Sequence, residues 1–180
     1  MPSTREKANY KAVRRAVAVI NSTATLKEKL DAIIRGTARS LAAGASLVFL
    51  DTTKKKLIHA SSWALPQFYL RKGVLDADKS LSEVLIEQPV VIADVTTDGR
   101  IQYPQIAARA GIVSILGVPV MSGASPVGSI RVYTKQHYDF TNQDISFVTT
   151  MANLASVALS QSRQPQDKEP QIIPLRQASQ

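Results

Sequence analysis

Four short polar signals, each followed by apolar residues at helical spacing, mark where helices should begin. In each signal a Ser or Thr stands three residues before an acid, so that its hydroxyl can accept a backbone N–H while the acid faces the positive end of the helix. The pairs are Ser3/Glu6, Thr25/Glu28, Ser80/Glu83 and Thr141/Asp144. The pattern predicts helices that start near residues 4, 26, 81 and 142.

The last of these segments, 142–162, is apolar along two stripes. The stripes are Ile145, Val148, Ala152, Ala155 and Leu159, and Phe147, Met151, Leu154 and Ala158. A helix that is apolar on two sides has two partners, one of which should be the chain's own sheet. The second partner is either another part of the same domain or a second copy of the chain. We favour the second copy, with Met151 and Leu154 at the interface between the two chains. The basic N-terminal helix should contribute to the same dimer seam.

Between the helical segments lie five short runs that are rich in β-branched and aromatic residues and bounded by turn residues. They are 46–50, 57–63, 89–93, 113–120 and 126–134. The first two runs and the last two are joined by connections short enough for antiparallel hairpins. The order of elements predicts helices on one face of an antiparallel sheet. The longer connections, 64–88 and 94–112, should then cross the opposite face or its rim.

Composition narrows the possible chemistry. The chain of 180 residues has no cysteine, which excludes disulfides, thiolate metal sites and thiol nucleophiles. His59 and His137 lie far apart in the sequence, and none of the common nucleophile, phosphate-loop, dinucleotide or zinc-protease motifs is present. We therefore expect a protein that is not an enzyme and that carries no cofactor and no metal.

The formal net charge of +8 permits a nucleic-acid partner. The positive residues are scattered in small groups, however, and no zinc-finger spacing or aromatic RNA-binding motif accompanies them, so we interpret them as solvated surface. No stretch approaches the roughly 18 apolar residues of a membrane span, and the N-terminus lacks the apolar core of a secretory signal. The expectation is a cytoplasmic protein with neither a membrane nor a nucleic-acid partner.

Candidate ligand contacts gather after the strand at 89–93 and in the last strand. Alternation with period two puts Arg131 and Tyr133 on the face of the sheet that the long connections cover. A guanidinium aimed into a covered space needs an acid, an anion or water. Asp94 or Asp98 could be its structural partner; alternatively, Arg131 and its neighbours anchor a small ligand with an anionic or carbonyl group. The candidate ligand-binding residues are Trp63, Asp94, Asp98, Arg100, Tyr103, Arg131 and Tyr133.

Two segments together resemble a GAF domain. One is Pro89-Val-Val-Ile-Ala-Asp94 with Asp98-Gly-Arg100, Tyr103-Pro104 and Gly111 to Val120; the other is Gly128-Ser-Ile-Arg131-Val-Tyr133 with Phe140, Thr141 and Asp144. The resemblance implies an α/β fold of the α+β type: a central antiparallel sheet of five or six strands, terminal helices on one face and a pocket roofed by the connections on the other. The resemblance covers a GAF-like domain at 24–162; a basic helix at 1–23 precedes it, and the Pro- and Gln-rich composition of 163–180, without periodicity, predicts a disordered tail.

The resemblance also implies a stand-alone sensory module of bacterial-type signalling. Such a module would bind a small molecule and act through a homodimer of its terminal helices or through a signalling partner protein. Cyclic-nucleotide-binding members share Lys135, Phe140 and Asp144, but Thr134 and Ile145 depart from their pattern, and Lys135 could simply pair with Asp144. Members that attach bilins or reduce free methionine sulfoxide use cysteines that this chain lacks. The alternative is a protein-interaction and dimerisation module with a vestigial pocket and no ligand.

Overall fold

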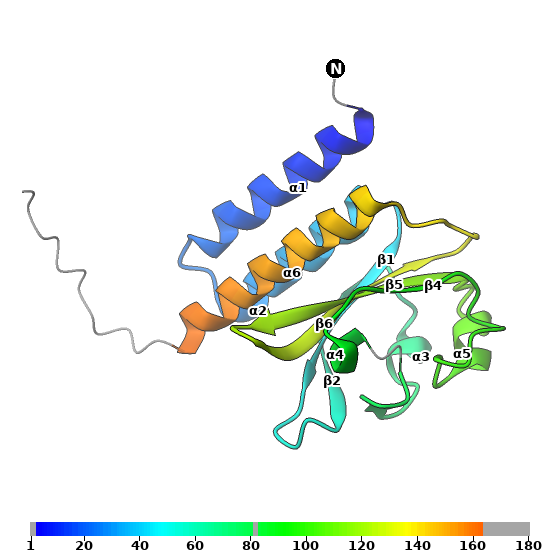
Figure 1. Cartoon of the computed structure of the whole chain (residues 1–180). Helices are drawn as coiled ribbons and strands as arrows, with labels where there is room; N and C mark the ends of the chain where they lie inside the picture. The colour runs from blue at the N-terminus through cyan, green and yellow to red at the C-terminus, as the bar shows by residue number, and fades with distance from the viewer. Residues whose placement is uncertain (1–2, 81–82, 164–180) are drawn as a thin grey trace, which may run out of the picture.

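The computed structural model describes residues 3–80 and 83–163, which form one sheet with helices on both faces (Figure 1). The helices are α1 (Thr4–Ile20), α2 (Leu26–Ser40), α3 (Gln67–Leu70), α4 (Glu83–Ile86), α5 (Pro104–Arg109) and α6 (Asn142–Arg163). The strands are β1 (Gly44–Leu50), β2 (Lys56–Trp63), β3 (Leu75–Asp76), β4 (Val90–Ile92), β5 (Ser114–Ser122) and β6 (Ser125–Thr134). The tail predicted at 163–180 falls, from residue 164 on, outside the described residues.

The six strands form one antiparallel sheet in the order β3-β2-β1-β6-β5-β4. Both predicted hairpins, β1–β2 and β5–β6, are present. The sixth strand, β3, has only two residues, which pair with Lys56 and Leu57 at the start of β2. So short a strand has no alternation of its own to reveal it, which is why the sequence pattern did not predict it.

The helices separate to the two faces of the sheet as the element order predicted (Figure 1). The long helices lie on one face: α2 and α6 pack on the sheet, α1 packs on α2 and α6, and the main apolar core extends from the sheet through these helices to α1. The short helices α3, α4 and α5 belong to the connections on the other face, where a second, smaller apolar cluster lies. Among the described residues, no helix combines the length and the apolar character that crossing a bilayer requires.

Three of the four predicted helix starts are confirmed by their caps. In α1 and α2 the cap residues Ser3 and Thr25 each accept from the backbone of the acid three residues on, and that acid accepts in return. At the start of α6 the Asp144 backbone N–H donates to Thr141 Oγ1 at 3.2 Å, and the Thr141 N–H donates to Asp144 Oδ2 at 3.0 Å. The fourth pair lies at the start of α4: Ser80 precedes this helix and Glu83 is its first residue. The side chains of both accept hydrogen bonds from another residue, described below.

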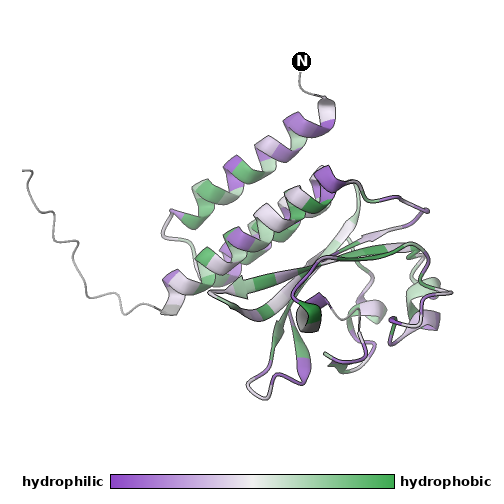
Figure 2. Ribbon diagram, viewed as in Figure 1, coloured by the Kyte–Doolittle hydropathy of each residue, from purple (hydrophilic) through white to green (hydrophobic). Residues whose placement is uncertain are grey.

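The second apolar stripe of α6 is covered by the chain's own helices, which corrects the placement of Met151 at a dimer seam. Met151 is 0% exposed. A Cβ added to Gly36 of α2 would lie 3.3 Å from Met151 Cε and 3.5 Å from Ala12 Cβ of α1, so the three helices meet at this point. The apolar half of α1 lies beside α6 in Figure 2 and buries Ala16 and Ile20 in the core. The small residues of α1 made this partner hard to recognise from the sequence.

Met151 should therefore matter for folding and not for association. We expect Met151→Ala to lower the free energy of unfolding by about 2–5 kcal/mol, because it leaves a cavity between three packed helices. Urea unfolding followed by circular dichroism measures this loss. Asn153→Ala, an exposed change on the same helix, is the control and should stay within about 0.5 kcal/mol of the unmodified protein. A Met151→Ala protein of normal stability would contradict the packing described here.

Candidate functional site

A small polar cavity lies between the sheet and the connections on its second face. Its two parts have volumes of about 10 and 70 Å³. The larger part has room for a few water molecules, since about 10–15 Å³ is the least space that holds one. Strands β1, β2, β5 and β6 supply its floor, and α3 with the neighbouring connections supplies its roof. The polar side chains of its lining are Ser46, His59, Tyr69, Lys72, Ser80, Gln102, Tyr103, Arg131 and Tyr133.

Arg131 ties the central strand β6 to the roof. Its side chain is almost completely buried, and its Nε donates to Glu83 Oε1 at 2.7 Å. Its two terminal nitrogens donate to Ser80, one to Oγ at 2.8 Å and the other to the backbone carbonyl at 3.0 Å. Burial alone would lower the pKa of Arg131, but the charge and hydrogen bond of Glu83, together with the neighbouring Tyr133 and Tyr69, leave it above its ordinary value. Ser80 and Glu83, which resembled a helix cap, thus hold an arginine.

The proposed structural partners Asp94 and Asp98 do not contact Arg131, which corrects that part of the sequence analysis. Asp94 Oδ1 accepts from the backbone and the hydroxyl of Thr96 at 2.8 and 2.6 Å, and these hydrogen bonds lower the pKa of Asp94. Asp98 pairs with its neighbour Arg100, whose Nη2 lies 2.6 Å from Asp98 Oδ2. The side-chain hydrogen bond from Arg100 lowers the pKa of Asp98. Both acids therefore have local partners that shape the turn after β4.

The buried phenols of Tyr69 and Tyr133 form one wall of the cavity. Tyr133 Oη lies 2.9 Å from Ser46 Oγ, and its ring meets that of Tyr69 edge to face at a centroid distance of 5.6 Å. Burial raises the pKa of both phenols, so both hydroxyls keep their protons near neutral pH. The wall therefore offers hydrogen-bond donors and acceptors but no negative charge.

Lys72, which the sequence analysis did not single out, brings a second positive charge into the cavity. Its Nζ lies 3.7 Å from the centroid of the Tyr69 ring and donates to the Tyr69 carbonyl at 3.2 Å. Burial, and then the charge of Arg131, lower the pKa of Lys72 to about 8. No carboxylate of residues 3–80 or 83–163 lies within 4.0 Å of this ammonium group. A single lysine after an aromatic segment gives no sequence signal that could have revealed it.

Tyr103 closes the rim of the cavity. Its hydroxyl donates to the Val74 carbonyl at 2.8 Å, and a Cβ added to Gly73 would lie 3.0 Å from that hydroxyl. Next to it, Gln102 Oε1 accepts from the Asp76 backbone at 2.9 Å. These contacts fasten the connection 94–112 to β3. Within the described ranges, no three His, Asp or Glu side chains converge on a point where a metal ion could bind.

Trp63 lies on the helical face of the sheet, away from the cavity. An irregularity in the pairing of β1 with β2, between Leu47 and Val48, leaves Ala60 without a partner. Before it, His59 lines the cavity; after it, Ser61 donates to Asp31 of α2 at 2.6 Å. The extra residue reverses the alternation, so Trp63 follows Ser61 to the helical side.

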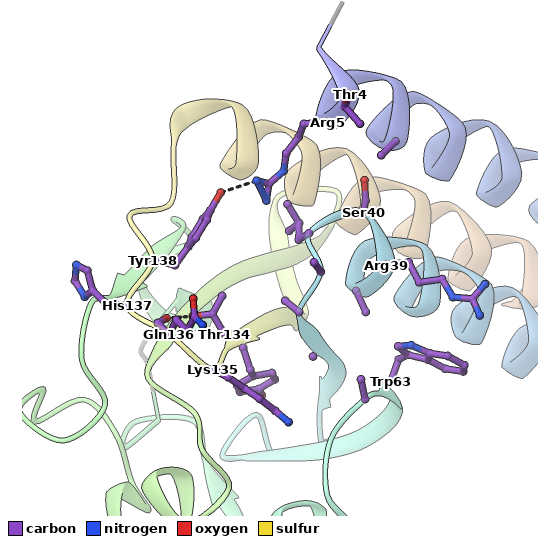
Figure 3. A pocket seen from close by; sticks show the side chains of 18 residues that line it. Thr4, Arg5, Arg39, Ser40, Trp63, Thr134, Lys135, Gln136, His137 and Tyr138 are labelled. Atoms are coloured by element: carbon purple, nitrogen blue, oxygen red, sulfur yellow. Dashed lines mark hydrogen bonds between the residues drawn. The ribbon is translucent and has the colours of Figure 1, made fainter.

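There Trp63 lines a larger hollow of about 930 Å³, where the start of α1 meets the ends of α2, β2 and β6 (Figure 3). The Arg39 side chain lies beside the indole in Figure 3, with its guanidinium carbon 5.2 Å from the ring centroid. Arg5 of α1 donates to Tyr138 Oη at 2.8 Å and lies 3.6 Å from Asp144, which Lys135 was expected to pair with. Lys135 is exposed and lines this hollow.

Of the seven candidate ligand-binding residues, the structure brings Tyr103, Arg131 and Tyr133 together around the cavity. Asp94, Asp98 and Arg100 are not among the residues that line it, and Trp63 lines the hollow on the other face. Sequence reasoning missed Ser46, Tyr69, Lys72 and Glu83. Ser46 and Glu83 carried a usable signal. Ser46 is a polar residue within a buried strand and Glu83 is an acid in a covered connection, and both kinds of group need hydrogen-bond partners.

Solved structures of other proteins share this architecture. A GAF domain of a phosphoenolpyruvate-protein phosphotransferase from Acinetobacter is 23% identical with a TM-score of 0.73, covering 90% of this chain and 96% of that chain. A segment of a methyl-accepting chemotaxis protein is 21% identical with a TM-score of 0.66, and the match covers 83% of this chain and 95% of that chain. A free methionine-R-sulfoxide reductase from Neisseria meningitidis is 15% identical with a TM-score of 0.74, and the match covers 91% of this chain and 96% of that chain.

At such identities these likenesses concern the fold alone. No curated protein is similar enough to this sequence to count as a match. A family model, however, covers most of the chain: the model described as GAF domain matches residues 22–160. With the six-stranded sheet, the helical layer on one face and the roofed cavity on the other, this match shows that the chain belongs to the GAF domain family.

Proposed function

We propose that this GAF domain is a non-catalytic signalling module that binds a small anionic molecule in the cavity between sheet and roof. One observation carries the proposal: two buried or half-buried cations, Arg131 and Lys72, line the cavity, and among the described residues only Arg131 has a carboxylate, Glu83, within 4.0 Å. One positive charge is thus left without a compensating acid. A buried charge without a counterion is costly, and an anionic ligand would remove that cost.

The surrounding groups suit a carboxylate or a similar anion. The guanidinium offers a planar fork of donors, and the ammonium group adds a mobile point charge. The hydroxyls of Tyr69 and Tyr133 keep their protons and can donate to a ligand oxygen. Glu83 Oε2 is buried without a donor among the described residues, so a ligand that reached it would also have to donate a hydrogen bond there.

A ligand in this cavity would act on the helical layer through β6. Arg131 and Tyr133 face the cavity, while Ile130 and Val132 of the same strand lie in the core under the helices. The segment that follows β6 leads into α6 through Tyr138, which contacts α1 through Arg5. A shift of Arg131 away from Glu83 would therefore move β6 and, through it, the terminal helices. The occurrence of this fold in a chemotaxis protein and a phosphotransferase supports a role in signalling.

The second candidate function is an interaction module whose cavity no longer binds anything. The small volume of the cavity and the occupation of Arg131 by Glu83 favour it. On this account the pair only fastens the roof to the sheet. The two candidates differ in what Lys72 does, because a purely structural cavity has no need of a cation that burial destabilises.

The ligand proposal predicts that a small anion raises the melting temperature and that this rise depends on Lys72. We would titrate acetate, 2-oxo acids, small amino acids and inorganic phosphate into the full chain. Affinity should fall as the pH rises through about 8, the pKa of Lys72, because the ammonium group then loses its proton. Lys72→Gln should abolish the rise without lowering stability, whereas Lys55→Gln, an exposed control, should keep it. A panel with no effect, or an unchanged response in Lys72→Gln, would refute the proposal.

The buried pair itself should be strongly coupled. Glu83→Gln and Arg131→Met should each lower the free energy of unfolding by roughly 3–5 kcal/mol, because each leaves a buried group without its partner. The double variant Glu83→Gln/Arg131→Met should lose clearly less than the sum of the two single losses in urea unfolding. The pair of Asp98 and Arg100 provides the control, since Arg100 is exposed and the change Arg100→Gln should cost no more than about 1 kcal/mol. Additive losses would show that the pair does not hold the roof.

We further propose that the output passes through a homodimer of the terminal helices, with a seam different from the one that the sequence suggested. Large apolar side chains stay exposed on α1 and α6: Tyr10 at 69%, Val17 at 39% and Val157 at 45%. Tyr10 and Val17 are seven residues apart, which puts them on one side of α1. The two helices lie next to each other, so these residues are the ones free to meet a second copy.

Charges placed at this seam should give a folded monomer. Val17→Glu combined with Val157→Glu should shift the protein from dimer to monomer in sedimentation velocity, because the dimer would bury both carboxylates. Ile58→Glu changes another exposed apolar residue, on β2, and should leave the dimer intact. Circular dichroism checks that each variant is folded. An unmodified protein that sediments as a monomer at micromolar concentrations would rule the seam out.

A further inference from the structure

A basic groove of about 450 Å³ runs between α1 and α2 on the outside of the helical layer. Its apolar lining consists almost wholly of small residues, namely Ala8, Ala12, Ala18, Val19, Ala32 and Gly36. Four cations stand along it, Lys11 and Arg15 from α1 and Arg35 and Arg39 from α2. The groove is separate from the cavity under the roof, because the whole sheet lies between them.

The four cations are exposed, and none of the residues that line the groove is acidic. Over the described ranges, no carboxylate lies within 4.0 Å of any of the four. Elsewhere on the same helix the charges are paired, since Lys27 Nζ lies 2.6 Å from Asp31 Oδ2. Surface charges that serve only solubility have both signs interspersed. A single sign concentrated along a groove attracts a partner of the opposite sign.

The spacing of the cations suits a helix. Lys11 and Arg15 are four residues apart, as are Arg35 and Arg39, so each pair spans one helical turn. Acids four residues apart on a partner helix have the same spacing. A floor of methyl groups and a glycine lets a helix approach closely, whereas a nucleic-acid backbone would use the cations and gain nothing from the floor. A second copy of this chain would bring like charges together if it presented the same groove.

We infer that the groove between α1 and α2 docks an acidic amphipathic helix of a partner protein. The partner's Asp and Glu side chains lie against Lys11, Arg15, Arg35 and Arg39, and its small apolar residues lie on the alanine floor. This docking goes beyond the proposed ligand binding and does not depend on it. It leaves the exposed residues Tyr10, Val17 and Val157 uncovered for the dimer.

Trp63 provides a built-in reporter for this groove. It is the only tryptophan of the chain, and the guanidinium carbons of Arg35 and Arg39 lie 4.9 and 5.2 Å from its ring centroid. Arg39 also lines the hollow in which Trp63 lies (Figure 3), and because Arg39 belongs to the groove as well, the groove and that hollow adjoin. A partner carboxylate that draws either guanidinium away from the indole changes the surroundings of Trp63 and hence its fluorescence.

The test uses the full chain and a synthetic stapled helix with alanine on one face and glutamates four residues apart along both edges of that face. A comparison peptide of the same composition has its glutamates spread around the helix. Titrations are followed by Trp63 fluorescence and by calorimetry. We expect at least tenfold tighter binding of the first peptide, weakened by added salt. Changing Lys11, Arg15, Arg35 and Arg39 to Gln should abolish it.

The matched control changes Lys7, Lys54, Lys55 and Lys56 to Gln, which removes the same charge from exposed positions outside the groove. This variant should bind the first peptide nearly as well as the unmodified protein. Equal affinity for the two peptides, or an equal loss in both variants, would show an unspecific charge effect and overturn the inference. Tighter binding of duplex DNA than of the first peptide, lost in the groove variant, would identify a nucleic-acid surface and overturn it as well. None of these results bears on ligand binding in the cavity.

Discussion

The contact on which both faces of this molecule depend is the buried ion pair of Arg131 and Glu83. It joins the central strand β6 to α4 in the roof, and Ser80 accepts one hydrogen bond from each terminal nitrogen of the guanidinium. A buried pair of this kind adds little net stability compared with apolar residues of the same size, but losing one partner is costly. The pair therefore fixes where the roof lies more than how stable the fold is. On the same face Tyr69 packs edge to face on Tyr133, and Lys72, the second cation of the cavity, lies over the Tyr69 ring.

The sequence predicted the framework because the framework rests on local rules. Three helix starts follow from capping pairs, and both hairpins follow from alternation and short turns. The same alternation placed Arg131 and Tyr133 on the covered face, correctly, since β6 has regular pairing on this stretch. Belonging to the GAF family was likewise visible from the strand and turn segments. These features need no knowledge of distant contacts.

What the sequence could not predict depends on contacts between segments far apart in the chain. Glu83 lies 48 residues from Arg131, and its spacing from Ser80 made it resemble a cap, whereas Asp94 and Asp98 are satisfied within their own turn. Trp63 changed face because of one unpaired residue, Ala60, which the sequence of the strand does not announce. Met151 became a core residue because α1 folds back onto α6 with side chains as small as Ala12. In each case a local pattern had two outcomes, and the tertiary packing selected one.

The arrangement of charge suggests how the two faces of the sheet could work together. The cavity and the groove each hold more positive than negative charge, and the sheet separates them. They are connected through β6, whose alternate residues face the cavity and the helical core. Communication between two such sites needs an element with two arrangements that both ligands influence. The proposed anion would compete with Glu83 for Arg131 and so loosen the contact between α4 and β6, and a partner on α1 and α2 would reach the same strand only through the core, so the contact between α4 and β6 is where the two could be coupled.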